Sequence, residues 1–288
     1  IKVYKDFFDV IFIINSSFLR GKSCKTMPLF SLEDIGLVSK KNAKIFLSAC
    51  GGDSVYYQFA TVDPRISTTF THQNSKISNR VAAIEKNVFK IINGIIPMSY
   101  QYAQAYRLYA KDLNILPSIH LPFDISSVPD RKSYMKDGKI VIFNAALRPK
   151  KGIVYIDKAL EIIKENYSDK IVIKDVRLPY DEYLRFLTTV DLFIDLCVDY
   201  DYGMSAISAM AAGCVVFSGN EPETQKELGH YDVPVVGISP QVQDIVDKIE
   251  YYIINPEQIE IIGRRSIAYA KKYHNCKTIA EQYLKTFR

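Results

Sequence analysis

The sequence predicts an α/β fold with two doubly wound lobes. Short β-branched or aromatic runs alternate with helical patterns along the chain, and this alternation is typical of parallel sheets covered by helices. The 288 residues suffice for about two ordinary domains, and the 48% hydrophobic content supplies two substantial cores. The predicted strands are Phe8–Ile14, Ala43–Ala49, Gly94–Met98, Lys139–Ala145, Lys170–Val176, Asp191–Leu196, Cys214–Phe217 and Pro234–Ile238.

Composition and charge exclude several classes of protein. With 24% charged residues, 13 Gly and 12 Pro, the chain is neither disordered nor collagen-like. No apolar run approaches the ~18 residues that cross a bilayer, so we expect no membrane span. The net charge of +5 favours phosphates or an anionic surface and does not require a nucleic-acid partner. Five cysteines without a CxxC pair indicate a reduced, cytoplasmic setting.

A first candidate site follows the strand predicted at Lys139–Ala145. Arg148, Lys150 and Lys151 lie between this strand and a helix that begins after Gly152. Ligands of open α/β sheets bind outside the carboxyl ends of strands, where a helix N-terminus adds about half a positive charge. A guanidinium and a lysine three residues apart suit a diphosphate. The alternative interpretation is a solvated basic loop.

A second candidate site is the segment from Asp195 to Gly213. A strand ends near its start, a short loop carries Tyr202 and Gly203, and a helix of small residues runs on to Gly213. Glycine at the start of this helix would let a phosphate approach the free main-chain N–H groups closely. The alternative is that the small residues only make a well-packed buried helix.

Together, the two segments resemble the nucleotide-binding lobe of retaining GT-B glycosyltransferases of the family-four type (glycosyl transferases group 1). That family has an Arg…Lys-Gly turn, matched by Arg148, Lys151 and Gly152. The family's later motif is an aromatic-Gly pair that opens a helix of small residues, and it is matched by Tyr202, Gly203, Ala209, Met210, Ala211, Gly213 and Val215. The resemblance covers about residues 138 to 288 and is weaker in the part of the chain before residue 138.

The resemblance implies two Rossmann-like lobes. Residues 1–137 would form an acceptor-side lobe, residues 138–274 the nucleotide-sugar lobe, and residues 275–288 a helix that packs back towards the first lobe. The early strands and glycine-rich loop of the family are missing or replaced, so the first lobe is expected to be short or truncated. No cofactor is implied, because the nucleotide-diphosphate sugar is itself the substrate.

The resemblance also assigns roles to residues. Arg148 and Lys151 would be catalytic, because they neutralise the diphosphate as it leaves, which needs no metal. Asp53 and His72 would line the acceptor side, although lone residues of this kind are often structural. Glu221 and Glu223 would face the sugar, the alternative being exposed loop carboxylates. The donor-binding residues implied are Tyr202, Gly203, Met204, Ser205, Ser208, Glu221 and Glu223.

The chain departs from the family pattern at two positions. Ser208 stands where a glutamate usually holds the ribose hydroxyls, and Tyr200 stands where many members have the first glutamate of the Glu-x7-Glu pair. A serine hydroxyl would hold a ribose less strongly than a carboxylate, by about 1 to 2 kcal/mol.

Asp199 and Asp201 form an Asp-x-Asp triplet that could share a divalent metal ion. The GT-B pattern explains the triplet better, so no metal site is expected.

The last stretch of the chain is basic and aromatic. From Arg264 to Arg288 there are seven Lys or Arg residues and one acidic residue, Glu281. This face could rest on anionic lipid near a lipid-linked acceptor. It could equally pack its aromatic rings onto the first lobe and leave its lysines in water, which is the preferred interpretation.

The resemblance implies a metal-independent, retaining glycosyltransferase. It would move a sugar from a nucleotide-diphosphate donor to a glycan or lipid-linked acceptor, in cell-surface polysaccharide or glycoconjugate synthesis. The expected location is cytoplasmic, with a peripheral contact at the inner membrane face. The alternative from another class is a non-catalytic GT-B-like binding or partner subunit of a glycosyltransferase complex, and a nucleotide-sugar epimerase of the same fold is a further rival.

Overall fold

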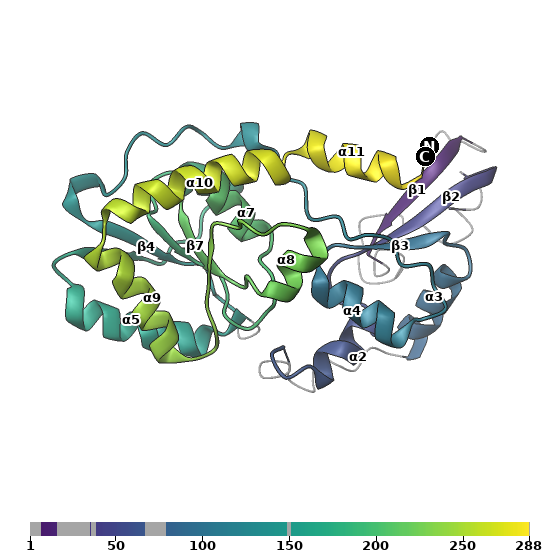
Figure 1. Ribbon diagram of the computed structural model, residues 1–288, viewed down its shortest axis with the longest axis horizontal. Coiled ribbons are helices and arrows are strands. Elements are labelled where there is room, and N and C mark those ends of the chain that lie inside the picture. The colour runs from purple at the N-terminus through teal and green to yellow at the C-terminus, as the bar shows by residue number, and fades with distance from the viewer. Residues whose placement is uncertain (1–6, 16–34, 36–38, 67–78, 149–150, 288) are drawn as a thin grey trace. The chain divides into compact units, whose positions relative to one another are not determined.

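The computed structural model describes residues 7–15, 35, 39–66, 79–148 and 151–287 and confirms the α/β fold (Figure 1). Every run predicted as a strand forms one, at bounds close to those expected. Each strand pairs in parallel with its neighbours. The strands are β1 (Phe8–Ile14), β2 (Ser39–Ala49), β3 (Gly94–Pro97), β4 (Ile140–Asn144), β5 (Ile171–Lys174), β6 (Leu192–Ile194), β7 (Val215–Ser218) and β8 (Val235–Gly237).

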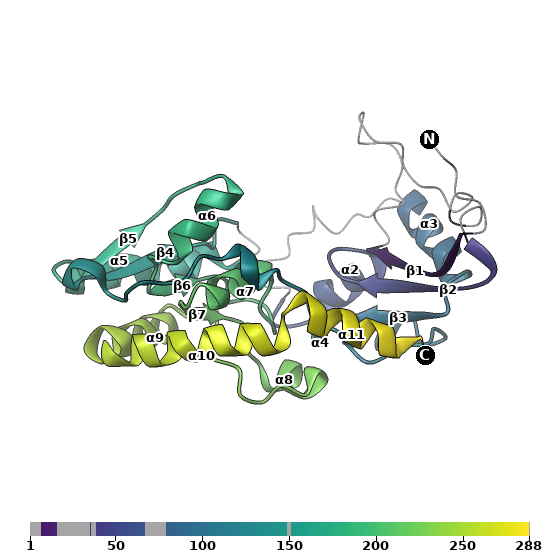
Figure 2. The ribbon, with the colours of Figure 1, turned by 90° about the horizontal axis from the view of Figure 1, so that it is seen from above.

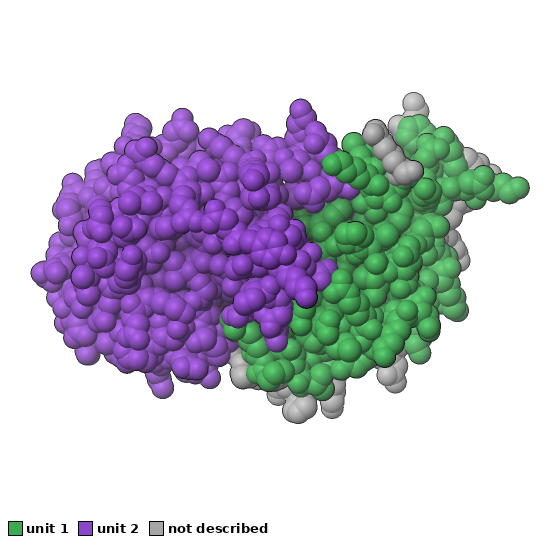
Figure 3. Space-filling view, in the orientation of Figure 1, with its two compact units in different colours: residues 1–120, 284–288 green, residues 121–283 purple. Residues whose placement is uncertain are grey.

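The chain divides into two compact units (Figure 3). Unit 1 comprises residues 1–120 and 284–288, and unit 2 comprises residues 121–283. The sequence placed the divisions at 137/138 and 274/275, so the observed units differ from the expected lobes at both borders. The chain passes from unit 1 into unit 2 after His120 and returns after Tyr283.

Unit 1 holds a parallel sheet whose order, among the residues described, is β1-β2-β3. Leu47 pairs with Ile13 on one side and with Ile95 on the other. Leu47 and Ile95 are fully buried, as expected for a parallel sheet covered by helices. In the described part of this unit, α2 (Ser54–Val62), α3 (Asn79–Phe89) and α4 (Tyr100–Tyr109) are helices.

Unit 2 holds a parallel sheet of order β5-β4-β6-β7-β8 in the described part of the chain. The chain moves from β4 outward to β5 and then crosses back over β4 to β6. The strand order therefore reverses between β4 and β6, which is where open α/β sheets bind their ligands. Its helices are α5 (Ile153–Tyr167), α6 (Tyr180–Leu187), α7 (Met204–Ala211), α8 (Pro222–Leu228), α9 (Val242–Ile254), α10 (Glu257–Tyr273) and α11 (Cys276–Thr286), whose last turn belongs to unit 1.

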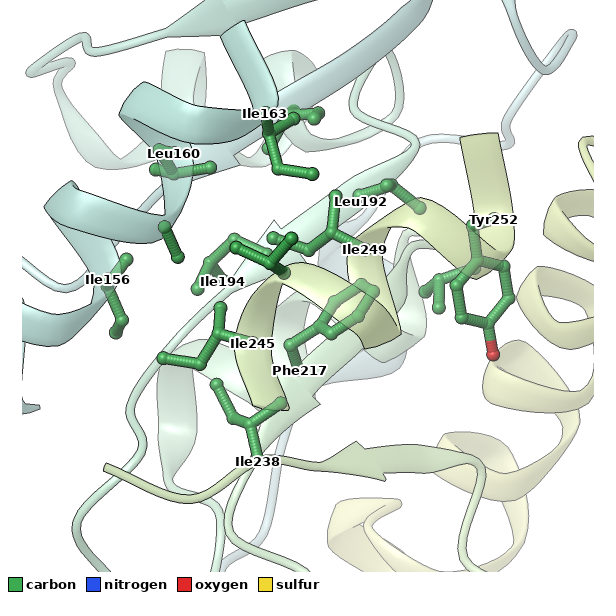
Figure 4. Close-up of a cluster of buried hydrophobic side chains, with 14 of the residues drawn as sticks. Ile156, Leu160, Ile163, Leu192, Ile194, Phe217, Ile238, Ile245, Ile249 and Tyr252 are labelled. Carbon is green, nitrogen blue, oxygen red and sulfur yellow. The ribbon is translucent and has the colours of Figure 1, made fainter. Parts of the chain in front are cut away.

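Each face of the unit 2 sheet has its own apolar core. One core joins α5 and α9 to the sheet, and Figure 4 shows side chains of both helices meeting Leu192, Ile194 and Phe217. The other core joins α6, α7 and α10 to the opposite face, and Figure 2 shows α10 running alongside α7 and β7. Each buried Ile or Leu contributes about 1.5 to 3 kcal/mol of burial free energy. As predicted, the inward face of α5 is made of Ile156, Ala159, Leu160 and Ile163.

The polar stretch of residues 124–138 packs onto unit 2. The Arg131 side chain is 3% exposed and forms an ion pair with Asp191, whose side chain is 1% exposed. The guanidinium also donates hydrogen bonds to the main-chain oxygens of Leu187, Val190 and Ala212. The border between the units precedes this stretch because Arg131 attaches it to the second sheet.

The end of the chain packs on unit 1. The ring of Phe287 lies against the ring of Phe12 in β1, with centroids 5.9 Å apart. The Phe287 main-chain oxygen accepts a hydrogen bond of 3.0 Å from Lys44 Nζ in β2. These contacts explain why residues 284–288 belong to unit 1.

Candidate functional site

The two segments singled out from the sequence follow neighbouring strands. Asn144, the last residue of β4, pairs with Ile194, the last residue of β6. The loop after β4 leads to Lys151 and α5, and the loop after β6 leads to Gly203 and α7. Both loops therefore leave the same edge of the sheet at the point where the strand order reverses.

Lys151 and Ser205 meet at this edge through Asp195. The Asp195 carboxylate is fully buried, and its Oδ1 accepts hydrogen bonds from Lys151 Nζ at 2.5 Å and from Ser205 Oγ at 2.6 Å. Its Oδ2 accepts from Ser218 Oγ at 3.1 Å, from the end of β7. Lys151 Nζ also lies 3.3 Å from Ser205 Oγ, and its side chain is 22% exposed. The lysine is thus held at the start of α7 with part of its surface open to solvent.

Sequence reasoning gave no role to Asp195 or Ser218. A signal for Asp195 was present, because the strand Leu-Phe-Ile ends directly on this carboxylate while a neighbouring strand leads to lysines. Opposite charges at the carboxyl ends of adjacent parallel strands are brought close together. Ser218 carried no such signal, because a serine at the end of a strand is common.

The start of α7 is open. Gly203 is the N-cap residue and has an extended backbone (φ −109°, ψ −166°), with no side chain capping the helix. A Cβ atom added to Gly203 would meet nothing within 4 Å, so the described residues leave open space beside this glycine. The unpaired N–H groups of the first turn make this position attractive for an anion.

The turn that carries Lys151 needs glycine at its end. Gly152 caps α5 with φ +82°, a left-handed conformation that residues with a Cβ atom adopt at a cost. A Cβ at Gly152 would also overlap Cys197 Sγ and lie 3.0 Å from Val198 Cγ1 in the loop after β6. The two site loops therefore touch at this glycine.

Arg148 is exposed at the edge of the same loop. Its main-chain oxygen accepts a hydrogen bond of 2.9 Å from the N–H of Lys151. In the described part of the chain, no side chain pairs with its guanidinium. Lys150 and His72 lie outside the described residues.

The other residues predicted to bind the donor occupy different environments. Met204 is 44% exposed beside Gly203. Tyr202 and Ser208 are buried, with exposed fractions of 2% and 3%. The Ser208 hydroxyl donates to the Ser205 main-chain oxygen at 2.8 Å. The structure therefore places Tyr202 and Ser208 behind the surface that carries Lys151 and Gly203.

Glu221 and Glu223 lie at the start of α8. Glu221 is the N-cap residue, and its N–H donates to the Tyr200 oxygen at 3.1 Å. Glu223 is exposed in the first turn. Thr224 Oγ1 donates to the same Tyr200 oxygen at 3.1 Å, so the loop after β7 is attached to the loop that precedes Gly203.

The Asp-x-Asp triplet has local partners. Asp199 Oδ1 accepts from the Tyr200 N–H at 2.8 Å, and Asp201 Oδ1 accepts from the Tyr202 N–H at 2.7 Å. Asp201 is 2% exposed. Within the ranges that the structure describes, no group of three or more His, Cys, Asp or Glu side chains could hold a metal ion.

Asp53 in unit 1 is a helix cap. Its Oδ1 accepts from the Tyr56 N–H at 2.7 Å, its Oδ2 accepts from the Tyr106 hydroxyl at 2.7 Å, and it is 1% exposed. Burial raises its pKa from the ordinary 3.8 to about 6, and the nearby Glu85 adds to the rise. Asparagine and aspartate are preferred N-caps, so this role could have been predicted from the sequence.

Asp53→Asn is expected to remove a pH dependence of stability. A raised folded pKa means that the folded state binds a proton more tightly, so stability is greatest below about pH 4 and falls as the pH rises through about 6, by up to about 3 kcal/mol. The asparagine keeps a bond to Tyr56 and cannot ionise. Hydrogen exchange of unit 1 peptides at several pH values measures this, with exposed Asp112→Asn as control. Equal pH profiles for parent and variant would contradict it.

The basic end of the chain turns much of its aromatic surface inward. Tyr269 in α10 is 6% exposed, while Lys271 and Lys272 are exposed. Arg264 pairs with Glu260, and Arg265 pairs with Asp232. Among the described residues, no helix is both long and apolar enough to cross a bilayer.

Residues 143–285 match the sequence model of a family described as glycosyl transferase-like. This range contains Lys151, Asp195, Gly203, Ser205 and Ser218, and hence the whole cluster around Asp195. No curated protein sequence matches the chain.

Solved glycosyltransferase structures share the fold. The chain is similar to sucrose-phosphate synthase from Thermosynechococcus elongatus, with a TM-score of 0.63, 14% identity, and 86% of this chain and 68% of that chain covered. It is similar to HepE from Anabaena in complex with UDP, with a TM-score of 0.59, 15% identity, and 85% of this chain and 72% of that chain covered. It is also similar to a mutant of TarM from S. aureus in complex with fondaparinux, alpha-GlcNAc-glycerol and UDP. Here the TM-score is 0.60 and the identity 16%, and 88% of this chain and 53% of that chain are covered. The fold is thus that of GT-B glycosyltransferases, and the family match supports the same class.

Proposed function

We propose that this protein transfers a sugar from a nucleoside-diphosphate sugar to a glycan or lipid-linked acceptor. The observation that carries the proposal is the Lys151 ammonium, held by Asp195 beside the open start of α7. Both groups lie at the carboxyl edge of the sheet, at the reversal of strand order where nucleotides bind in this class of fold. UDP complexes of HepE and TarM support a nucleoside diphosphate as the ligand.

The chemistry follows from the charges at this edge. In the transfer, an acceptor hydroxyl oxygen would form a bond to the anomeric carbon and pass its proton to the departing diphosphate. The bond between the anomeric carbon and the diphosphate oxygen breaks, and that oxygen leaves with the electron pair. Lys151, the first N–H groups of α7 and the exposed Arg148 would stabilise the negative charge that develops there. Lys151 is held by Asp195 and the N–H groups belong to the first turn of α7, so both would need little reorganisation.

Further features belong to the same proposal. Retention of configuration and membership of the family-four type rest on the sequence resemblance, and the anomeric configuration of the product by NMR tests retention. Metal independence is tested by activity in the presence of a chelator. The role in cell-surface polysaccharide or glycoconjugate synthesis also rests on the resemblance, as does a cytoplasmic location with peripheral contact to the inner membrane face.

Titration calorimetry with a panel of nucleoside diphosphates tests the proposal. We expect one-to-one binding of at least one of them, with the corresponding nucleoside binding far more weakly. Arg148→Ala should weaken this binding at least about tenfold, because one charge-assisted hydrogen bond contributes about 1.5 to 3 kcal/mol. Arg264→Ala is the matched control, since this arginine is exposed on α10 and paired with Glu260. No binding of any nucleoside diphosphate would favour a non-catalytic binding or partner subunit.

A donor-sugar panel with mass detection then identifies the sugar and the reaction. Transfer to an acceptor or to water releases the nucleoside diphosphate. An epimerase of the same fold would instead change the sugar without an acceptor, so product analysis in the absence of acceptor separates the two enzymes.

A further inference from the structure

A chain of buried hydroxyl and imidazole groups lies directly behind the start of α7. The Tyr202 hydroxyl lies 3.1 Å from the Tyr269 hydroxyl and 3.1 Å from His274 Nε2. The Tyr269 hydroxyl lies 3.1 Å from His230 Nδ1, and His274 Nδ1 lies 3.1 Å from the Leu121 main-chain oxygen. Tyr202, Tyr269 and His274 are buried, so the two bonds of the Tyr202 hydroxyl are shielded from water, while the bonds to His230 and Leu121 are part-buried.

The direction of these hydrogen bonds follows from one fixed acceptor. The Leu121 oxygen can only accept, so His274 Nδ1 carries the proton. In the neutral form of this tautomer Nε2 is an acceptor, so the Tyr202 hydroxyl would donate to it, and the Tyr202 oxygen would accept from Tyr269. Burial raises the pKa of both phenols, so each keeps the proton that it donates.

His274 also holds the first residues of unit 2 through its main chain. The Phe123 N–H donates to the His274 oxygen at 2.7 Å, and Phe123 forms a parallel β-bridge with Asn275. The Phe123 ring is 3% exposed. His274 therefore binds segment 121–123, which the chain enters as it leaves unit 1, and the loop that ends in Gly203.

The loop before Gly203 has little room to shift. The Tyr202 ring meets the His274 ring edge to face, with centroids 5.6 Å apart. On the other side, a Cβ added to Gly219 would lie 2.7 Å from the Asp201 nitrogen and 2.8 Å from the Asp201 oxygen. The loop is thus fixed between the end of β7 and the His274 ring, and Tyr202 is the side chain that reaches His274.

We propose that His274 is a positioning residue, which holds Tyr202 and thereby sets the place of the N–H groups at the start of α7. The inference rests on the proposed function in one respect, namely that a diphosphate binds at α7. Tyr269 lies on α10 and His274 directly follows this helix, so both residues would act on a site at the start of α7. A misplaced binding group loses affinity steeply, because hydrogen bonds to a phosphate depend on distance and angle.

Two variants test the role of His274. Tyr202→Phe keeps the ring and removes the hydroxyl, and His274→Leu removes both side-chain bonds. For both we expect roughly tenfold or greater loss of affinity for UDP and for inorganic pyrophosphate, measured by calorimetry. His274→Gln offers one donor and one acceptor and should recover part of the loss. Tyr251→Phe, in an exposed position on α9, is the matched control.

Amide hydrogen exchange of residues 203–205 in the ligand-free protein gives a second readout. We expect faster exchange there in Tyr202→Phe than in the parent, without a change across α5. If Tyr202→Phe folds, keeps parent affinity for both anions and keeps parent exchange at 203–205, the network is only structural and the inference fails. If the parent binds neither anion, the proposed function fails, and the exchange rates still decide whether His274 positions α7.

Discussion

Lys151→Met is expected to weaken UDP binding by about two orders of magnitude. The substitution removes a charge-assisted hydrogen bond to phosphate, which contributes about 1.5 to 3 kcal/mol. It also leaves the buried Asp195 carboxylate beside the start of α7 without its cation, where it repels an incoming anion. Calorimetry of the parent and the variant with UDP measures the change.

Two further variants separate these contributions. Lys151→Met combined with Asp195→Asn lacks both charges, so it should bind UDP more tightly than Lys151→Met alone and less tightly than the parent. Lys158→Met removes an exposed lysine from α5 and should bind like the parent. Parent affinity in Lys151→Met would place the diphosphate site elsewhere.

Arg131→Met is expected to destabilise unit 2 by about 3 to 5 kcal/mol. Arg131 and Asp191 are both almost fully buried, and breaking such a pair leaves an unpaired charge in the interior. The Arg131 guanidinium also satisfies main-chain oxygens, including that of Ala212, which lose their donor. Hydrogen exchange of unit 2 peptides with mass detection measures the loss without assuming that the two units unfold together.

The pair can be tested against its own double variant. Arg131→Met with Asp191→Asn removes both charges, and we expect it to be more stable than Arg131→Met alone. Arg264→Met breaks an exposed pair with Glu260 and should cost less than about 1 kcal/mol. An equal effect of Arg131→Met and Arg264→Met would show that burial of the first pair is unimportant.

The strands and the two site loops could be predicted because their signals are local. β-Branched runs such as Ile140–Asn144 mark strands by themselves, and Gly152 and Gly203 mark the loop ends that follow. Because ligands bind at the carboxyl ends of parallel strands, the two loops were expected to lie together at one edge of the sheet. Lys151 and Ser205, one from each loop, both donate a hydrogen bond to Asp195 there.

The border between the units could not be predicted, for a physical reason. Residues 124–138 have no hydrophobic period, since Arg131 attaches them by bonds to main-chain oxygens. Every residue has such an oxygen, so the sequence carries no sign of these partners.

Tyr202 and Ser208 illustrate a second limit of prediction from the sequence. A motif gives the place of Ser208 along α7 and of Tyr202 in the loop before it, whereas the burial of both depends on packing with α6 and α10.

The Lys151 ammonium has three N–H donors, and the two contacts described above occupy two of them. Among the described residues this leaves one donor for a phosphate oxygen while Asp195 stays bound. In the proposed function, a phosphate would add one bond to this lysine without displacing the carboxylate. Selectivity among anions must come from how many additional oxygens the α7 N–H groups and Arg148 can reach. A diphosphate meets that requirement better than chloride or a monoanionic carboxylate.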